Sequence, residues 1–175
     1  MRVLLVVALQ ILPMLRCLLS LAPLFLLAAC TPENQLTDLS EHIEPNPSDG
    51  IGHYVYALTA SPTVAPGESY NVGMEWRTVG PADPTSSGRY TMDLQLTGPT
   101  TKVYTVGPSA NTIGEYHLTN WLEHRFAIPA DFPQGEYQVG VRVRDAEGAV
   151  VPLGYVADRA LGEGFYLLTT VLVEG

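Results

Sequence analysis

The clearest pattern in the chain is a strict alternation of apolar and polar positions over residues 137–144. The two rows are Tyr137, Val139, Val141 and Val143 against Gln138, Gly140, Arg142 and Arg144. A period of two places one row against a core and the other in water, as in a half-buried strand. Pro133 and Gly135 come just before this run, and both residue types favour a sharp turn into the strand.

The same period recurs along the chain and predicts further strands. It is equally regular over residues 70–76 and 90–97, where Tyr70, Trp76 and Tyr90 fall on the inward rows. Shorter strands are predicted at 51–60, 102–106, 121–128, 149–153 and 164–173. In the first of these, Tyr54, Tyr56 and Leu58 are expected on one face. With many Pro and Gly turns and no helical period, the fold class is all-β: a single antiparallel sandwich of about seven or eight strands.

The segment that leads into the central strand resembles a known structural motif. Asp131, Gly135 and Tyr137 form a D-x-x-x-G-x-Y sequence, which is similar to the tyrosine corner of immunoglobulin-like and fibronectin-III-like sandwiches. The resemblance implies that the Tyr137 hydroxyl bonds to nearby upstream backbone. Val139 stands where antibody-type domains have a cysteine, so the similarity is to the sandwiches without a disulfide.

The start of the chain has a different composition. Residues 18–29 are apolar, follow Arg16 and end in small residues, which is typical of a secretory signal. Leu27, Ala28, Ala29 and Cys30 resemble the lipobox of bacterial lipoproteins. The resemblance implies cleavage before Cys30 and a diacylglyceryl thioether on its sulfur. The alternative is an uncleaved membrane anchor.

A second apolar run, residues 2–15, precedes this signal. Our hypothesis is that translation begins at Met14. The alternative is one long helix over residues 3–29, which would be long enough to span a bilayer but is interrupted by Pro13, Arg16 and Pro23. Thr31 follows the lipid site. In Gram-negative lipoproteins an aspartate there commonly retains the protein at the inner membrane, so Thr31 is compatible with transfer to the outer membrane, which is the expected location in the cell envelope.

The expected domain organisation has three parts. Residues 1–29 are the signal peptide, residues 30–50 carry the lipidated Cys30 and a flexible tether, and residues 51–175 form the immunoglobulin-like sandwich. The tether is predicted because this segment has no sustained apolar period and ends in Pro-Asn-Pro-Ser-Asp-Gly. A single helical turn around residues 36–43 remains an alternative within it.

Charge excludes one class of partner. Arg2 and Arg16 are the only charged residues before Cys30, so the rest of the chain holds seven basic and all 18 acidic residues. An acidic surface repels phosphate backbones, and nucleic acid is therefore not an expected partner. The membrane is the expected partner through the lipid anchor.

No constellation for catalysis is evident, and no cofactor or metal site is predicted. The only cysteine besides Cys30 is Cys17, which lies in the signal. His117 and His124 have no zinc-site spacing, and ordinary surface or partly buried positions are expected for the histidines. Glycoside hydrolysis needs two carboxylates held close together, and Glu75 and Asp93 are candidates, but both lie on outward rows and are expected to be solvated. Asp145 and Glu147 leave a calcium site open as a minor alternative.

Aromatic residues in or beside predicted loops are the remaining candidates for binding a ligand. They are Trp121, Tyr104, Tyr116 and Tyr155. Exposed rings can stack on sugars or anchor a protein partner, and the alternative is a lid over one end of the sandwich.

A second resemblance bears on function. Segments 66–82, 128–137 and 164–173 together are similar to accessory β-sandwich domains at the C-termini of bacterial secreted glycosidase-like proteins. We therefore expect a lipid-anchored envelope lipoprotein whose sandwich binds or scaffolds an envelope protein or glycan without catalysis. The alternative is a carbohydrate-binding accessory module. A hydrolase is the remote third reading.

Overall fold

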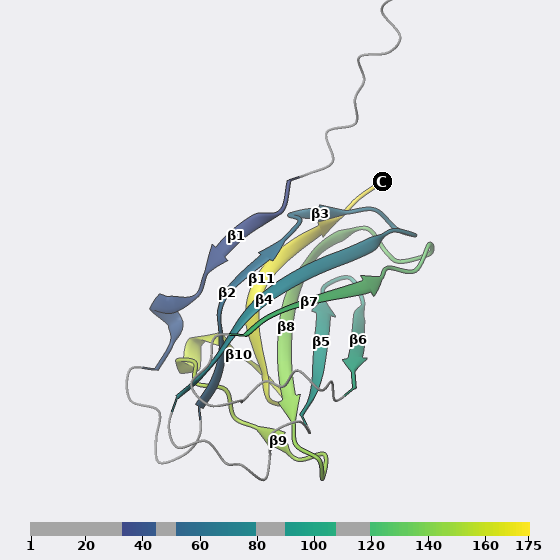
Figure 1. Cartoon of the computed structure of the whole chain (residues 1–175). Helices are drawn as coiled ribbons and strands as arrows, with labels where there is room; N and C mark the ends of the chain where they lie inside the picture. The colour runs from purple at the N-terminus through teal and green to yellow at the C-terminus, as the bar shows by residue number, and fades with distance from the viewer. Residues whose placement is uncertain (1–32, 45–51, 80–89, 108–119) are drawn as a thin grey trace, which may run out of the picture. The chain divides into compact units, whose positions relative to one another are not determined.

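The computed structural model describes residues 33–44, 52–79, 90–107 and 120–175 (Figure 1). Within these ranges the chain forms strands and two short 3-10 turns, which confirms the all-β prediction. In this part of the chain, no helix has the length and apolar character needed to cross a membrane. The signal, the lipobox and Cys30 lie outside the described residues.

The secondary-structure elements follow one another closely along the chain. The strands are β1 (Gln35–Asp38), β2 (Gly52–Ala60), β3 (Thr63–Val64), β4 (Ser69–Val79), β5 (Thr91–Thr97), β6 (Thr101–Val106), β7 (Asn120–Ala127), β8 (Gly135–Arg144), β9 (Val150–Val151), β10 (Ala160–Gly162) and β11 (Phe165–Val173). The 3-10 turns are η1 (Ser40–His42) and η2 (Ala157–Arg159).

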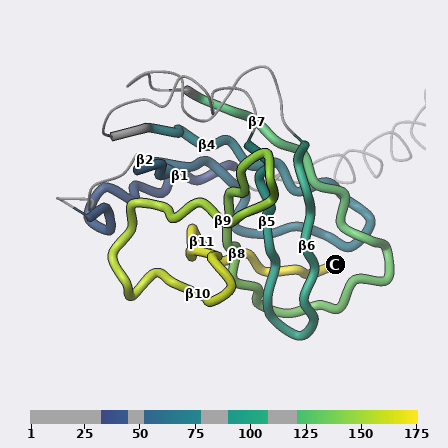
Figure 2. Tube along the Cα trace, turned by 90° about the horizontal axis from the view of Figure 1, so that it is seen from below, coloured from purple at the N-terminus to yellow at the C-terminus, as the bar shows by residue number. Residues whose placement is uncertain are grey.

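The strands form two facing sheets. One has the order β1-β2-β4-β7, and the other has the order β10-β11-β8-β5-β6, with β3 beside β11 and β9 beside β8. In Figure 2 the strands of the first sheet lie together in the upper part of the view, and those of the second sheet lie below them. β2, β4 and β7 share one sheet while β5, β8 and β11 share the other, which is the distribution of an immunoglobulin-like sandwich. The predicted fold class is confirmed.

The core lies between the sheets and is built from the predicted inward rows. Tyr70, Val72, Met74 and Trp76 of β4 are buried, and so are Tyr137, Val139, Val141 and Val143 of β8. β8 lies between β11 and β5 in the middle of its sheet. Its alternation is strong because one face of the strand packs against the opposite sheet along its whole length.

The predicted tyrosine corner is confirmed by a hydrogen bond. The hydroxyl of buried Tyr137 donates to the carbonyl of Pro133 over 2.8 Å. Its ring stacks on Phe132 with 5.0 Å between ring centroids. Gly135, between them, has φ of 143° and would bring a Cβ to 2.7 Å from Pro99 Cγ. Glycine therefore allows both the backbone conformation and the close approach at this turn.

One prediction of side-chain direction is wrong in β2. Tyr54, Tyr56 and Leu58 do not share a face, because Val55 pairs with Trp76 and Ala57 pairs with Glu75, which leaves Tyr56 as an extra residue. Such a bulge reverses the alternation. Val55 and Leu58 therefore enter the core, while Tyr54 and Tyr56 are half-buried.

The expected tether also differs from the structure over part of its length. β1 pairs antiparallel with β2, from Gln35 opposite Ala60 to Asp38 opposite Ala57. Leu39 follows with 0% of its surface exposed, in the core. The 3-10 turn η1 corresponds to the helical turn left open in the sequence. One short strand and a single buried leucine hold this segment against the sandwich. Neither produces a repeating apolar pattern in the sequence, so neither was predicted.

Candidate functional site

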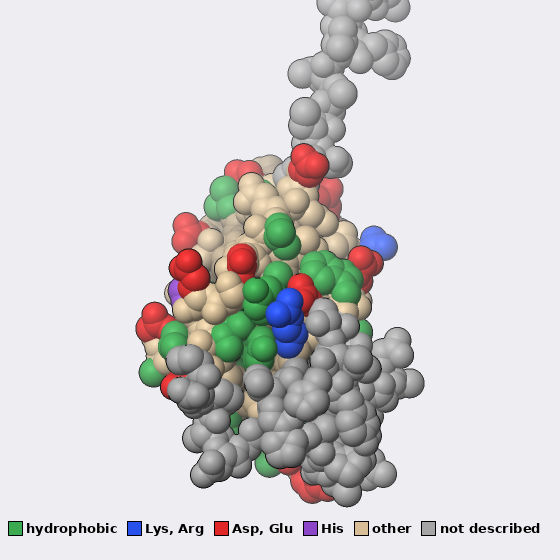
Figure 3. All heavy atoms as spheres, turned by 60° about the vertical axis from the view of Figure 1, so that its left-hand side comes forward, with side chains coloured by type: hydrophobic (Ala, Val, Ile, Leu, Met, Phe, Trp, Pro, Cys, Tyr) green, Lys and Arg blue, Asp and Glu red, His purple; other side chains and the backbone are tan. Residues whose placement is uncertain are grey.

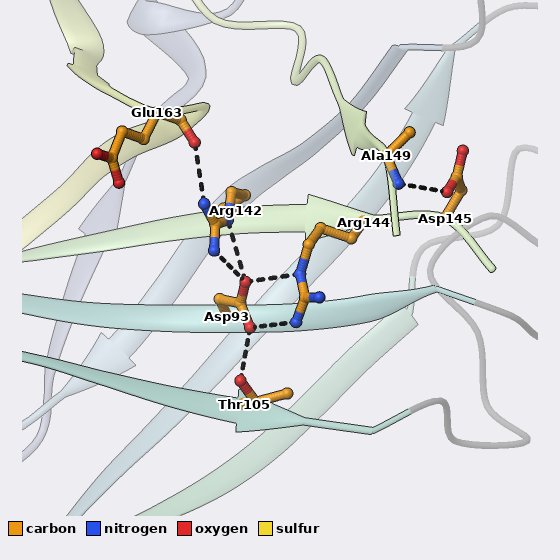
Figure 4. Close-up of polar contacts among 7 residues, drawn as sticks. All are labelled: Asp93, Thr105, Arg142, Arg144, Asp145, Ala149 and Glu163. Atoms are coloured by element: carbon orange, nitrogen blue, oxygen red, sulfur yellow. Dashed lines mark hydrogen bonds and ion pairs between the residues drawn. The ribbon is translucent and has the colours of Figure 1, made fainter. Parts of the chain in front are cut away.

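An acidic residue on the outer face of the larger sheet is enclosed by polar partners. The Asp93 carboxylate accepts hydrogen bonds from Arg142 at 2.7 Å, from Arg144 at 2.9 Å and from the Thr105 hydroxyl at 2.7 Å (Figure 4). The three partners come from β8 and β6, the neighbours of β5 on either side. Arg142 also donates to the Glu163 carbonyl and lies over the Phe165 ring.

This arrangement corrects the expectation that Asp93 is solvated. Its side chain is on the outward row, as predicted, but the residue is 0% exposed because the two arginines lie over it. Burial alone raises the pKa of Asp93, and the hydrogen bonds from Arg144, Thr105 and Arg142 outweigh it, so the pKa lies below its ordinary value. The cluster links three neighbouring strands around a carboxylate that is ionised at neutral pH.

Glu75 and Asp93 lie too far apart to act as a pair. Glu75 is on β4 in the smaller sheet, where it forms an ion pair of 2.6 Å with Arg77. Asp93 is on β5 in the larger sheet, and both side chains lie on outward rows of facing sheets. Two carboxylates on opposite outer faces cannot flank one glycosidic bond.

Two of the aromatic candidates turn out to have structural roles. Tyr155 is buried, donates to the Val55 carbonyl at 2.7 Å and accepts from the Val55 N–H at 2.8 Å. It is therefore no exposed ligand-binding ring, and this prediction is wrong. Tyr104 lies on β6, not in a loop, and its half-buried ring packs beside Phe126 while its hydroxyl donates to the Ala127 carbonyl. Tyr116 lies outside the described residues.

Trp121 is different, because it is a large exposed side chain on a sheet face. It is on β7 and 43% of its surface is exposed. Its six-membered ring lies over Gly73 of the adjacent strand: a Cβ on Gly73 would be 2.7 Å from Cζ2 and 3.0 Å from Cε2. The same Cβ would be 2.8 Å from the Thr59 hydroxyl. The indole thus packs directly on the β4 backbone at Gly73. A side chain on any residue larger than glycine at this position would fill the space that the ring occupies.

The surroundings of Trp121 form what we call the Trp121 face, the outward side of β1, β2, β4 and β7. It comprises Leu36, Tyr56, Thr59, Asn71, Gly73, Glu75, Arg77, Trp121, Glu123 and Arg125. Leu36 is 69% exposed, and Arg77 lies over the Tyr56 ring at 3.4 Å from its centroid. Figure 3, which views the protein from the side of β1 and β2, shows hydrophobic side chains gathered beside a basic group, with acidic groups around them.

A groove runs across this face next to the indole. It has a volume of about 470 Å³ and is lined by Asn34, Thr59, Asn71, Val72, Gly73, Glu123, His124 and Arg125. The indole of Trp121 lies over Gly73, which is one of the lining residues, so the ring and the groove meet at Gly73. Sequence reasoning identified Trp121, at the start of the predicted strand 121–128, but it missed the groove. The relation to Gly73 depends on the pairing of β4 with β7, which no local pattern specifies.

The histidines and the turn acids were also assigned roles by the sequence. His53 is 1% exposed, deeper than expected, and its Nε2 lies 3.3 Å from the Tyr90 hydroxyl. Burial lowers its pKa to about 4. Asp145 accepts from the backbone N–H groups of Glu147 and Ala149, which caps the turn after β8. In the part of the chain that the structure describes, no group of three or more His, Cys, Asp or Glu could hold a metal ion.

Comparison with known proteins adds little to this description. No family model matches the chain. No curated protein matches it either. One similar solved structure is the CARDB domain of a Pyrococcus furiosus protein in complex with di-metal ions, at 15% identity and a TM-score of 0.37, covering 81% of this chain and 94% of that one. The immunoglobulin-like class therefore rests on the strand pairing itself.

Proposed function

We propose that this chain is a lipid-anchored protein of the bacterial cell envelope whose sandwich is a non-catalytic binding domain. The single observation that carries the binding role is the Trp121 face, where an indole is held exposed on a sheet by its fit over Gly73. The lipobox residues Leu27, Ala28 and Ala29 before Cys30 support the anchor, and Thr31 supports the outer membrane.

The position of β1 sharpens the expected anchor. β1 begins at Gln35, five residues after Cys30. An extended chain spans at most ~3.3–3.6 Å per residue, so five residues reach roughly 17 Å. A lipid on Cys30 would therefore hold the sandwich close to the bilayer.

Two observations support a binding role over catalysis. The carboxylates considered for glycoside hydrolysis lie on opposite outer faces, and Asp93 is held in ion pairs. The face with the exposed indole carries two acidic and two basic residues, so its charges balance, and its exposed ring suits recognition through stacking and hydrogen bonds.

Metabolic labelling with an alkyne analogue of palmitate tests the anchor. The wild-type protein should carry the label, and Cys30→Ser should lose it. Cys17→Ser is the matched control, since Cys17 lies within the signal and the variant should be labelled normally. An unlabelled wild-type protein contradicts the anchor. Peptides from residues 1–13 in a digest of the unprocessed precursor would refute a start at Met14.

A further inference from the structure

The Trp121 face holds an aromatic ring in a fixed position, and this limits what it can bind. One side of the ring is taken by β4 backbone at Gly73, while the remaining exposed surface faces outward. Few rotamers are compatible with this contact, so little side-chain entropy would be lost when a ligand stacks on the indole. A preorganised ring favours a ligand with a flat, weakly polar surface.

The groove beside the ring adds polar groups of a particular kind. Asn34, Thr59 and Asn71 supply uncharged donors and acceptors, and Glu123 and Arg125 add one charge of each sign. Amide and hydroxyl groups of this kind pair with ligand hydroxyls. The charges of the groove cancel, so it has no preference for an anionic or cationic ligand.

These two features match the chemistry of a sugar ring. A pyranose presents C–H groups on one face and hydroxyl groups around its rim, so the face can stack on an indole while the rim bonds to amides and carboxylates. A phosphate-bearing ligand fits less well, because the nearby Arg77 is already paired with Glu75.

We propose that Trp121 and the adjoining groove form a subsite for chains of uncharged pyranose sugars. The inference rests on the proposed function only in taking the Trp121 face as the binding surface, and it does not depend on a lipid at Cys30. Trp121 stacks on one sugar unit, and the next units lie along the groove toward Asn71 and Asn34.

Affinity electrophoresis of the full chain in mild detergent tests the subsite. The gels contain dextran, mannan, a β-1,3-glucan, hydroxyethyl-cellulose or soluble chitin oligosaccharides, with polygalacturonate as the anionic comparison. At least one uncharged polymer should retard the wild-type protein. Trp121→Ala should weaken binding about tenfold or more, and Val103→Ala, at an exposed position of the other sheet, should leave it unchanged.

Substitution of Gly73 provides a second test without removing the ring. Gly73→Ala forces the indole off β4, since the Cβ would be 2.7 Å from Cζ2. Binding should fall several-fold. Gly107→Ala is the matched control, because a Cβ there meets nothing within 4 Å. Thermal unfolding of each variant checks that the sandwich is intact.

Fluorescence quenching gives an independent readout of the same contact. The chain has two tryptophans, and Trp76 is 1% exposed, so acrylamide quenching reports mainly on Trp121. The polymer that retards the protein should protect Trp121 from acrylamide.

Several results would overturn the subsite: no retardation by any uncharged polymer, retardation by polygalacturonate alone, or full binding by a folded Trp121→Ala variant. The subsite would also be overturned if the Trp121 face cross-linked to a protein partner and the protein bound no sugar. Palmitate labelling of Cys30 is measured separately, so failure of the anchor and failure of the subsite are distinguishable.

Discussion

The hydroxyl of Tyr137 and the carbonyl of Pro133 are joined by a hydrogen bond of 2.8 Å that ties the turn before β8 to the strand itself. The bond spans four residues and closes over Gly135. Phe132 stacks on the same ring. One side chain thus fixes the turn by a polar contact and by apolar packing, at the point where the central strand of the larger sheet begins.

Tyr137→Phe should destabilise the sandwich by about 1 kcal/mol, because it leaves the Pro133 carbonyl without its partner while keeping the buried ring. Urea unfolding at neutral pH, followed by tryptophan fluorescence, measures the change. An unchanged midpoint would show that the bond adds nothing to the corner.

Tyr70→Phe is the matched control for this experiment. Tyr70 is also a buried tyrosine, but its hydroxyl has no hydrogen-bond partner within the described ranges. Removing it should leave stability unchanged or increase it, since no bond is lost and a polar atom leaves the core. The difference in stability between the two variants separates the contribution of the hydrogen bond from the effect of removing a buried hydroxyl group.

Asp93→Ala should cost about 3 kcal/mol of unfolding free energy, because it leaves Arg142 and Arg144 without the carboxylate between them. Glu75→Ala removes one partner of the more exposed pair with Arg77 and should cost less than about 1 kcal/mol. Equal losses in urea unfolding would contradict the distinction between a buried cluster and a surface pair.

The features that sequence reasoning predicted well are those set by local alternation. The inward rows of β4 and β8 follow directly from a period of two, because each strand has one face against the core. The tyrosine corner was predictable for a similar reason, since Pro133, Gly135 and Tyr137 lie within five residues of one another. Both features need no knowledge of which strands are neighbours.

The wrong or missing predictions depend on pairing across the chain. The alternation of apolar and polar residues in the sequence predicted that Asp93 lies on the outer face of its sheet. That arginines cover Asp93 follows only from the pairing of β5 with β8, which sets Asp93 opposite Arg142. The contact between Trp121 and Gly73 requires the pairing of β4 with β7. Tyr155 is in a segment without strand period, and its burial follows from a hydrogen-bonded contact with Val55, 100 positions earlier in the chain.

The buried His53 should make the sandwich less stable at acidic pH. Its pKa is about 4 in the folded protein against 6.5 in an unfolded chain, because burial disfavours the charged ring. The unfolded state therefore takes up a proton first, and stability is lost as the pH falls from 6.5 toward 4. Between pH 7.5 and pH 5 the loss should be about 2 kcal/mol.

Urea unfolding at these two pH values measures the effect, and His53→Gln should reduce the difference. Burial also lowers the pKa of His124, so a residual difference of the same sign is expected in the variant. Asp93 does not contribute in this range. Because the pKa of Asp93 is lowered in the folded protein, the stability that its carboxylate contributes is lost only when the pH falls below the ordinary aspartate pKa of about 3.9. A wild-type protein equally stable at both pH values would contradict a neutral, buried His53.

Leu39 decides whether residues 33–44 belong to the sandwich or only tether it. Leu39 is 0% exposed, so Leu39→Ala should cost about 2–5 kcal/mol through lost burial and a cavity. Leu36→Ala is the matched control in the same segment, because Leu36 is 69% exposed and its loss should change stability by less than about 0.5 kcal/mol. Both are measured by urea unfolding of the full chain.

If Leu39→Ala is as stable as the wild type, the segment is a tether and the chain between Cys30 and the folded domain is longer. A large loss places β1 in the folded domain.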